Sequence, residues 1–122
     1  MSMVQLTSES KKHWEFAEGY RSFNKGEVKE YLLIFNPSLT KKATATVTLF
    51  YDDGKDPTTI KLEIEPNQKN WIALHEDSRV RDRSEYGGIW YGIMIDADIG
   101  VIPYFTHYDF GSSFALEGTG RN

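Results

Sequence analysis

Regular alternation of apolar and polar residues constrains the fold of this chain more than any other feature. In the segment from Ala43 to Tyr51, apolar residues at every second position alternate with three threonines and Phe50. Successive side chains of a strand point to opposite faces of its sheet, so this spacing indicates a half-buried strand. A second alternating run, Ile60 to Ile64, follows the turn-forming segment Asp52 to Pro57. The two runs therefore predict a β-hairpin.

Five further segments have the length and composition of strands. They are His13–Tyr20, Val28–Asn36, Asn70–His75, Ile89–Asp96 and Val101–Tyr108. No extended segment has helical periodicity. The pattern predicts an all-β chain, folded as a two-sheet antiparallel β-sandwich of about seven strands. Pro103 lies inside the last segment, so we expect that segment to be a sheet edge or to carry a bulge.

Length, charge and composition limit the classes of function. A chain of 122 residues has the size of one domain. We expect residues 1–12, which are polar and lack periodicity, to be a flexible leader, and residues 13–122 to form a single β-sandwich domain. The net charge of −4 argues against nucleic acid as a partner. The absence of cysteine and of any run of about 18 apolar residues predicts a cytoplasmic location without membrane insertion.

The short motifs of known enzyme classes are absent from the sequence, including the nucleophile elbow, the P-loop and the dinucleotide fingerprint. The three histidines, His13, His75 and His107, lie on different predicted strands without the spacing of metal ligands. We therefore expect no cofactor, no metal and no catalytic residue. The enzyme alternative is a hydrolase or isomerase that uses Glu30, His107 and Asp109, and it requires these side chains to converge in one pocket.

Glu30 is a carboxylate embedded in an apolar strand. The period of two places it on the same face as Leu32, Ile34 and Asn36. A buried carboxylate is costly unless it is paired or hydrogen-bonded. Two interpretations stay open: Glu30 lies at a solvated rim, or it accepts hydrogen bonds from a ligand or from a neighbour such as Arg21.

Two segments of the chain together resemble the opening signature of the sensory rhodopsin transducer family. The first is His13-Trp14-Glu15-Phe16-Ala17-Glu18-Gly19-Tyr20, and the second is Glu30-Tyr31-Leu32-Leu33-Ile34-Phe35-Asn36-Pro37. The similarity continues through Val47–Tyr51 and, more loosely, Thr106–Asp109. The chain departs from the family in Tyr104–His107, where members have a Gln/His/Thr/Arg run before the aspartate, so the resemblance does not specify the ligand.

The resemblance implies a small all-β domain that binds a small molecule or transmits a signal. It also implies a homo-oligomer, with a tetramer as the expected size, and a signalling partner protein. A fold does not determine a function, so a rhodopsin is not required as that partner.

The aromatic and polar residues of the strands favour a sugar or a related polar metabolite as the ligand, because a ring would contact its C–H face and carboxylates or amides its hydroxyl groups. We expect the ligand-binding residues to be Trp14, Glu18, Tyr20, Glu30, Asn36, Thr106, His107 and Asp109. Trp71, Trp90 and Tyr104 are further candidate rings. Consecutive strands usually lie side by side, so Trp14, Glu18, Glu30 and Asn36 are expected to line one pocket. Two alternatives stay open. Strand aromatics such as Trp14 are more often core residues than ligand contacts. The chain as a whole is alternatively a protein-interaction or structural module without a small ligand.

Overall fold

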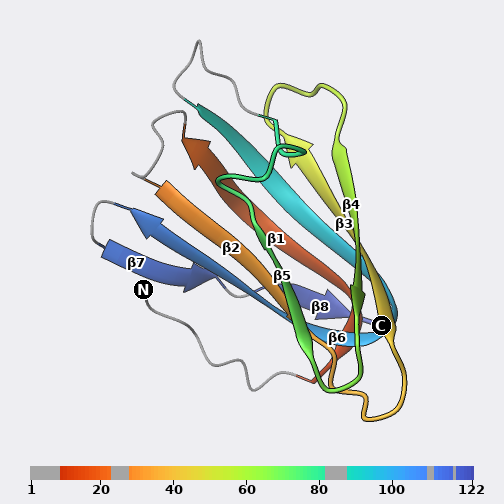
Figure 1. Ribbon diagram of the computed structural model, residues 1–122. Coiled ribbons are helices and arrows are strands. Elements are labelled where there is room, and N and C mark those ends of the chain that lie inside the picture. The colour runs from red at the N-terminus through yellow and green to blue at the C-terminus, as the bar shows by residue number, and fades with distance from the viewer. Residues whose placement is uncertain (1–8, 23–27, 82–87, 110–111, 117) are drawn as a thin grey trace.

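A computed structural model describes residues 9–22, 28–81, 88–109, 112–116 and 118–122. The described residues form eight strands, and all recorded pairings between them are antiparallel. The strands are β1 Lys11–Ser22, β2 Val28–Phe35, β3 Ala43–Tyr51, β4 Thr58–Ile64, β5 Lys69–Ala73, β6 Gly88–Asp109, β7 Ser112–Leu116 and β8 Thr119–Arg121. The predicted all-β, sandwich-like fold is confirmed (Figure 1).

The long strand β6 belongs to both sheets. Its first half pairs with β1 and β3, in a sheet of order β4-β3-β6-β1-β8 that we call sheet A. Its second half pairs with β2 and β7, and β5 pairs with the other side of β2; these strands form sheet B. The two runs expected at Ile89–Asp96 and Val101–Tyr108 are therefore one continuous strand. The seven segments predicted from the sequence also did not include the short strands β7 and β8.

Pro103 lies in the second half of β6, opposite Ile34 of β2. The strand β7 begins its pairing with β6 only at Phe105. Among the described residues, β6 is thus paired on only one side at Pro103. Proline has no backbone N–H to donate, so this sheet-edge environment suits it.

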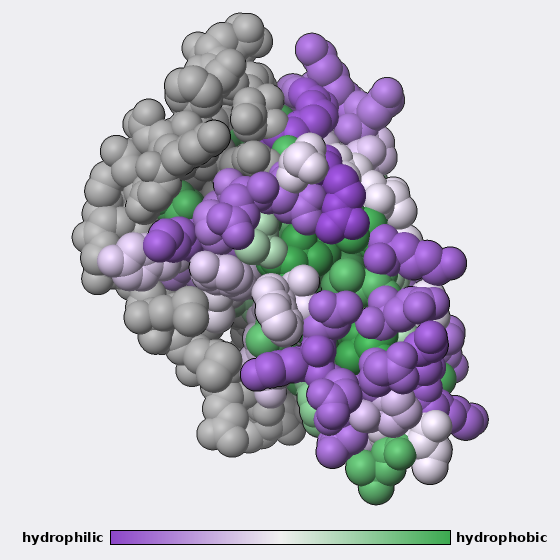
Figure 2. Space-filling model, viewed as in Figure 1, coloured by the Kyte–Doolittle hydropathy of each residue, from purple (hydrophilic) through white to green (hydrophobic). Residues whose placement is uncertain are grey.

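Inward residues of the two sheets make one core. Strand β3 alternates as its sequence predicts, with Ala43, Ala45, Val47, Leu49 and Tyr51 buried. The inward residues of β2 and β4 have the same period, because each strand buries only one face. On the surface seen from the side of Figure 1, Figure 2 shows hydrophobic residues near the middle of the view, with hydrophilic residues above, below and to the right of them.

Two glycines provide room for large rings of this core. The ring of Trp14 packs over Gly120 of β8, where an added Cβ would lie 2.7 Å from the indole. The ring of Tyr91 packs over Gly19 of β1, where an added Cβ would overlap the ring itself. Gly19 is part of the motif that resembles the transducer family, and its role in this structure is to accept the Tyr91 ring.

We predict that Gly19→Ala lowers the free energy of unfolding by about 1–3 kcal/mol, because the new methyl group overpacks the buried Tyr91 ring. Gly92→Ala on β6 is the matched control, since its Cβ would lie 3.7 Å from the nearest heavy atom, the carbonyl oxygen of Phe16. Urea unfolding of both variants measures the difference. Equal stability of Gly19→Ala and Gly92→Ala would contradict this packing.

Candidate functional site

Glu30 is a buried carboxylate that joins the two sheets. Its side chain points inward from β2, and the residue is 1% exposed. The Tyr91 hydroxyl donates a hydrogen bond to Oε1, and His107 Nδ1 lies 2.7 Å from Oε2. Tyr91 belongs to the half of β6 in sheet A, whereas His107 is the direct neighbour of Glu30 in sheet B. Hydrogen bonds from both sheets thus offset the cost of burying this carboxylate.

The backbone of Glu30 also holds the segment after β5. Leu74 N donates to Glu30 O at 2.8 Å, and His75 Nδ1 lies 3.2 Å from both Glu30 N and Glu30 O. The His75 ring meets Tyr31 edge to face, with the centroids 5.0 Å apart. The backbone and side chain of Glu30 therefore contact three separate parts of the chain.

Trp14 lies in the core rather than at a ligand surface. It is 2% exposed, and its indole N–H donates to the carbonyl oxygens of Lys11 and Val101, both at 3.0 Å. The register of β1 turns Trp14 inward, where Gly120 lies against the ring. A sugar has no access to this ring in the structure, so the expectation of Trp14 as a stacking face is corrected to the core alternative.

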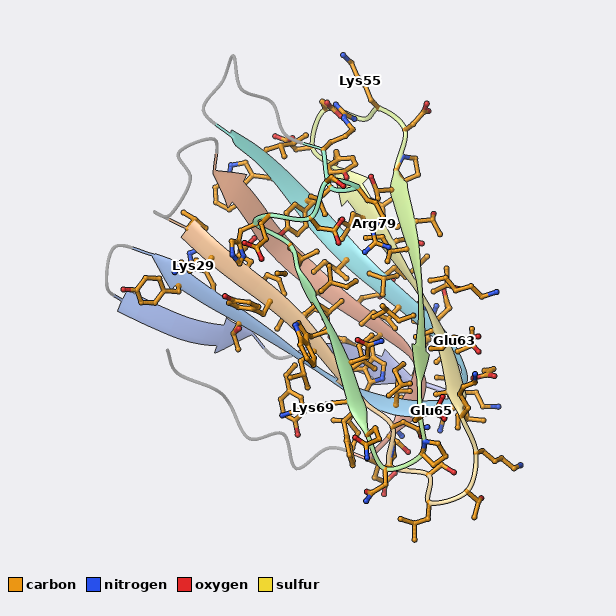
Figure 3. The ribbon with its side chains drawn as sticks, viewed as in Figure 1. Lys29, Lys55, Glu63, Glu65, Lys69 and Arg79 are labelled. Atoms are coloured by element: carbon orange, nitrogen blue, oxygen red, sulfur yellow. The ribbon has the colours of Figure 1, made fainter. Side chains whose placement is uncertain are left out.

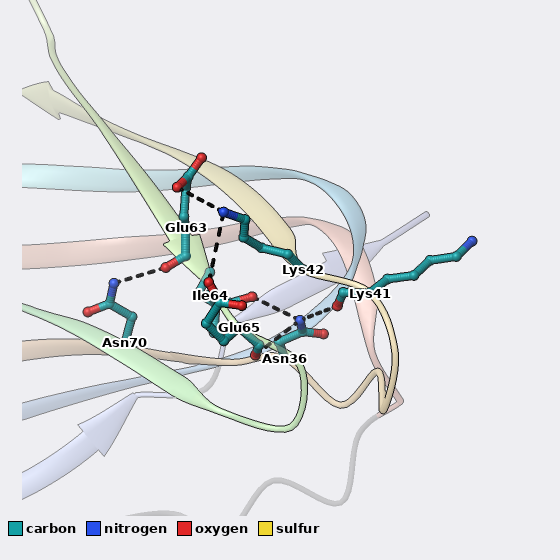
Figure 4. Close-up of polar contacts among 7 residues, drawn as sticks. All are labelled: Asn36, Lys41, Lys42, Glu63, Ile64, Glu65 and Asn70. Carbon is teal, nitrogen blue, oxygen red and sulfur yellow. Dashed lines mark hydrogen bonds and ion pairs between the residues drawn. The ribbon is translucent and has the colours of Figure 1, made fainter.

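Asn36 organises a turn at the far end of β2. Its Nδ2 donates to Lys41 O at 2.8 Å and to Ile64 O at 3.0 Å (Figure 4). Its Oδ1 accepts from Ser38 N at 3.0 Å. It lies six positions along the chain from Glu30, which is roughly 20 Å at the usual rise per residue. Glu30 and Asn36 share the inward face as predicted, but this distance keeps them from lining one pocket.

The other predicted site residues are spread over the fold. His107 contacts the Glu30 carboxylate, and the enzyme alternative requires these two side chains to lie together. Thr106 is turned toward the outer face of sheet B, where its Oγ1 is buried without a hydrogen-bond partner among the described residues. The side chains of Glu18, Tyr20 and Asp109 lie outside the described residues, and only their strand positions are known.

A feature that the sequence analysis did not assemble lies on the outer face of sheet A. It is an open hollow of ≈ 240 Å³, lined by Ala17, Phe50, Tyr51, Asp52, Trp90, Tyr91 and Gly92. Gly92 lies opposite Phe50 in the register of β3 and β6, so the missing side chain leaves space beside that ring. Phe50 is 47% exposed and Trp90 is 51% exposed. Two aromatic rings and a carboxylate therefore border the hollow, which we call the Gly92 hollow.

An ion pair fixes the chain beside the Gly92 hollow. Arg81 pairs with the Asp53 carboxylate, and its guanidinium lies 4.8 Å from the centroid of the Tyr51 ring. Arg81 N also donates to the Tyr51 hydroxyl at 2.9 Å. Hydrogen bonding from Arg81 lowers the pKa of the Asp53 carboxyl below its ordinary value of 3.8. Asp53 is thereby engaged with Arg81, and the neighbouring residue Asp52 lines the hollow.

The histidines do not gather into a metal centre. His13 Nδ1 lies 2.6 Å from Asp96 Oδ1 on sheet A, whereas His107 contacts Glu30 in sheet B. Within the described ranges, no three His, Cys, Asp or Glu side chains are grouped to hold a metal ion. The same residues include no helix that could cross a membrane.

Two solved structures have a similar fold. The Thermotoga maritima protein 1070 aligns over 93% of this chain and 97% of its own, with a TM-score of 0.77 and 20% sequence identity. The Anabaena sensory rhodopsin transducer aligns over 80% of this chain and 97% of its own, with a TM-score of 0.61 and 18% identity. The chain has the fold of a sensory rhodopsin transducer. No family model matches the sequence, and none of the curated proteins matches it either.

We predict that Tyr91→Phe lowers the free energy of unfolding by about 1–3 kcal/mol, because it keeps the ring on Gly19 but removes a donor to the buried Glu30 carboxylate. Tyr108→Phe, on the outward face of the same strand, is the control and should cost less. In a Glu30→Gln background the cost of Tyr91→Phe should shrink. An unchanged cost in that background would show that the two side chains do not interact.

Proposed function

We propose that this chain is a non-enzymatic module that binds a sugar or a related polar metabolite and serves sensing or signalling in the cytoplasm. The observation that carries the proposal is the Gly92 hollow, in which the exposed rings of Phe50 and Trp90 adjoin the Asp52 carboxylate. Aromatic faces suit the C–H side of a sugar ring, and a carboxylate accepts hydrogen bonds from hydroxyl groups. The site differs from the one expected at Trp14, while the ligand chemistry is the same.

The shape of the hollow predicts weak binding. It is open on the sheet surface, so a ligand keeps part of its area in water. A monosaccharide of about 12 heavy atoms at about −0.3 kcal/mol per atom gains only about −4 kcal/mol, which corresponds to a millimolar dissociation constant. An affinity in this range suits a sensor of an abundant metabolite.

The geometry of Glu30 and His107 supports a binding role over catalysis. Their separation of 2.7 Å would allow direct proton transfer. However, Glu30 is 1% exposed and His107 is 8% exposed, and the Glu30 carboxylate already accepts a bond from Tyr91. Substrate would have to displace these contacts to reach the pair. We therefore keep the hydrolase or isomerase as the less favoured candidate.

We predict millimolar binding of at least one member of a sugar and metabolite panel, measured by NMR titration at tens of millimolar with shifts centred on Phe50, Trp90 and Gly92. Trp90→Ala should weaken that binding about threefold to tenfold, the loss of one aromatic contact. Gly92→Val should abolish it, because the side chain occupies the hollow. Trp71→Ala, an equally exposed tryptophan on sheet B, is the control. A panel that moves no amide of sheet A would refute the proposal.

We also propose that the chain assembles as a homo-oligomer, with a tetramer as the expected size. The support is composition: aromatic residues make up 14% of a chain of only 122 residues, and an interface between subunits commonly buries rings that a small core leaves outside. Sedimentation velocity at micromolar concentration should give a species near four times the 14.0 kDa of the chain. A monomer alone would exclude the assembly without affecting the binding proposal.

A further inference from the structure

The outer face of sheet B combines apolar side chains with an unusual charge distribution. Outward residues of its strands are Tyr31, Leu33 and Phe35 of β2, Trp71 and Ala73 of β5, and Ile102 and Tyr104 of β6. Trp71 is 58% exposed and lies beside Leu33, which in turn lies beside Tyr104. These residues form a continuous apolar strip, which we call the sheet B strip.

Lysines mark the two ends of the sheet B strip. Lys29 precedes Tyr31 on β2, and Lys69 is the register partner of Phe35, six residues further along β2. At the usual rise, the two lysines are roughly 20 Å apart. Figure 3 shows them at well separated positions on this side of the molecule. Neither forms an ion pair with another residue in the described part of the chain.

None of the described outward side chains of β2, β5 and residues 102–108 is a carboxylate. The only acidic residue in β2, β5 and residues 102–108 is Glu30, and its side chain points inward to His107 and Tyr91. Beyond these ranges, Glu76 follows β5 and lies 3.7 Å from His75, and Glu65 precedes β5 in the turn whose Gln68 N donates to Glu65 O. In a chain of net charge −4, a strip whose own charges are two lysines attracts acidic groups.

The size and charge of the strip decide between a peptide and a second copy. Three strands over seven residues cover on the order of 300 Å², well below the roughly 800 Å² per partner of a standard interface. A second copy would also bring lysine-ended strips together without a carboxylate to neutralise them. A short extended segment with apolar residues between acidic ends matches both the area and the charge.

We propose that the sheet B strip is a docking surface for such a segment of a partner protein: extended, apolar in its middle and acidic at both ends. The apolar side chains would pack on Leu33, Trp71 and Tyr104. The terminal carboxylates would lie near Lys29 and Lys69. This surface is on the opposite sheet from the Gly92 hollow, so the two proposals stand independently.

Two synthetic peptides test the proposal on the full-length, isotope-labelled chain: one apolar core flanked by glutamates, and the same core flanked by lysines. NMR titration should show the acidic peptide shifting amides of β2, β5 and the second half of β6, with at least about tenfold tighter binding than the basic peptide, and a loss of this preference at high salt. Equal affinity for both peptides, or shifts confined to sheet A, would overturn the proposal.

Variants assign the effect to this surface. The double variant Lys29→Glu, Lys69→Glu should reverse the preference between the peptides, and both side chains are exposed, so the fold should be retained. Trp71→Ala should weaken the acidic peptide several-fold, whereas Trp90→Ala should not. If the same amides broaden with protein concentration in the absence of peptide, and Trp71→Ala removes the broadening, the strip is a contact between copies and the peptide proposal is wrong.

Discussion

The burial of one carboxylate, Glu30, between two sheets is the constraint on which this fold depends. The strand β6 connects the two sheets at one end, whereas the apolar contacts across the core are non-directional. Hydrogen bonds from Tyr91 and His107 to the same carboxylate fix the sheets relative to each other, because a displaced donor would leave a buried charge without compensation. Gly19 completes the arrangement by accepting the Tyr91 ring.

The same stretch of β6 connects this cluster to the outer surface. Tyr91 points inward to Glu30, whereas its neighbours Trp90 and Gly92 line the hollow on the outer face of sheet A. The alternation of a strand thus places a rigid polar anchor directly beneath an open aromatic site. For the proposed ligand, a site supported in this way would lose little conformational freedom on binding.

The alternation of apolar and polar residues predicted individual strands and the side chains that point inward. Strand β3 has the predicted bounds, and the inward position of Glu30 followed from its phase with Leu32 and Ile34. The continuity of β6 was not predicted, because Asp98 and Gly100 are residues typical of a turn. In the structure, Asp98 Oδ1 instead accepts a hydrogen bond from Thr44 N at 2.8 Å beside the bend between the sheets.

Contacts across long sequence separations explain the rest of the difference. The Glu30–His107 pair depends on the register of β2 against the second half of β6, which no periodicity encodes. The resemblance to the transducer family identified Trp14 and Asn36 as special positions, and the structure gives both of them structural roles. Two sequence features that form the hollow were visible but were not connected with each other. Phe50 occupies a position of β3 where the alternation places polar residues, and Gly92 lies within β6.

The most direct test of this account is a set of nuclear Overhauser contacts around Tyr91. The account predicts strong contacts from the Tyr91 ring to the α-protons of Gly19 and to the side-chain methylene protons of Glu30, because the ring packs on the first and its hydroxyl binds the second. Absence of both contacts, together with exchange contacts between the Glu30 side chain and water, would contradict the claim that this carboxylate joins the two sheets.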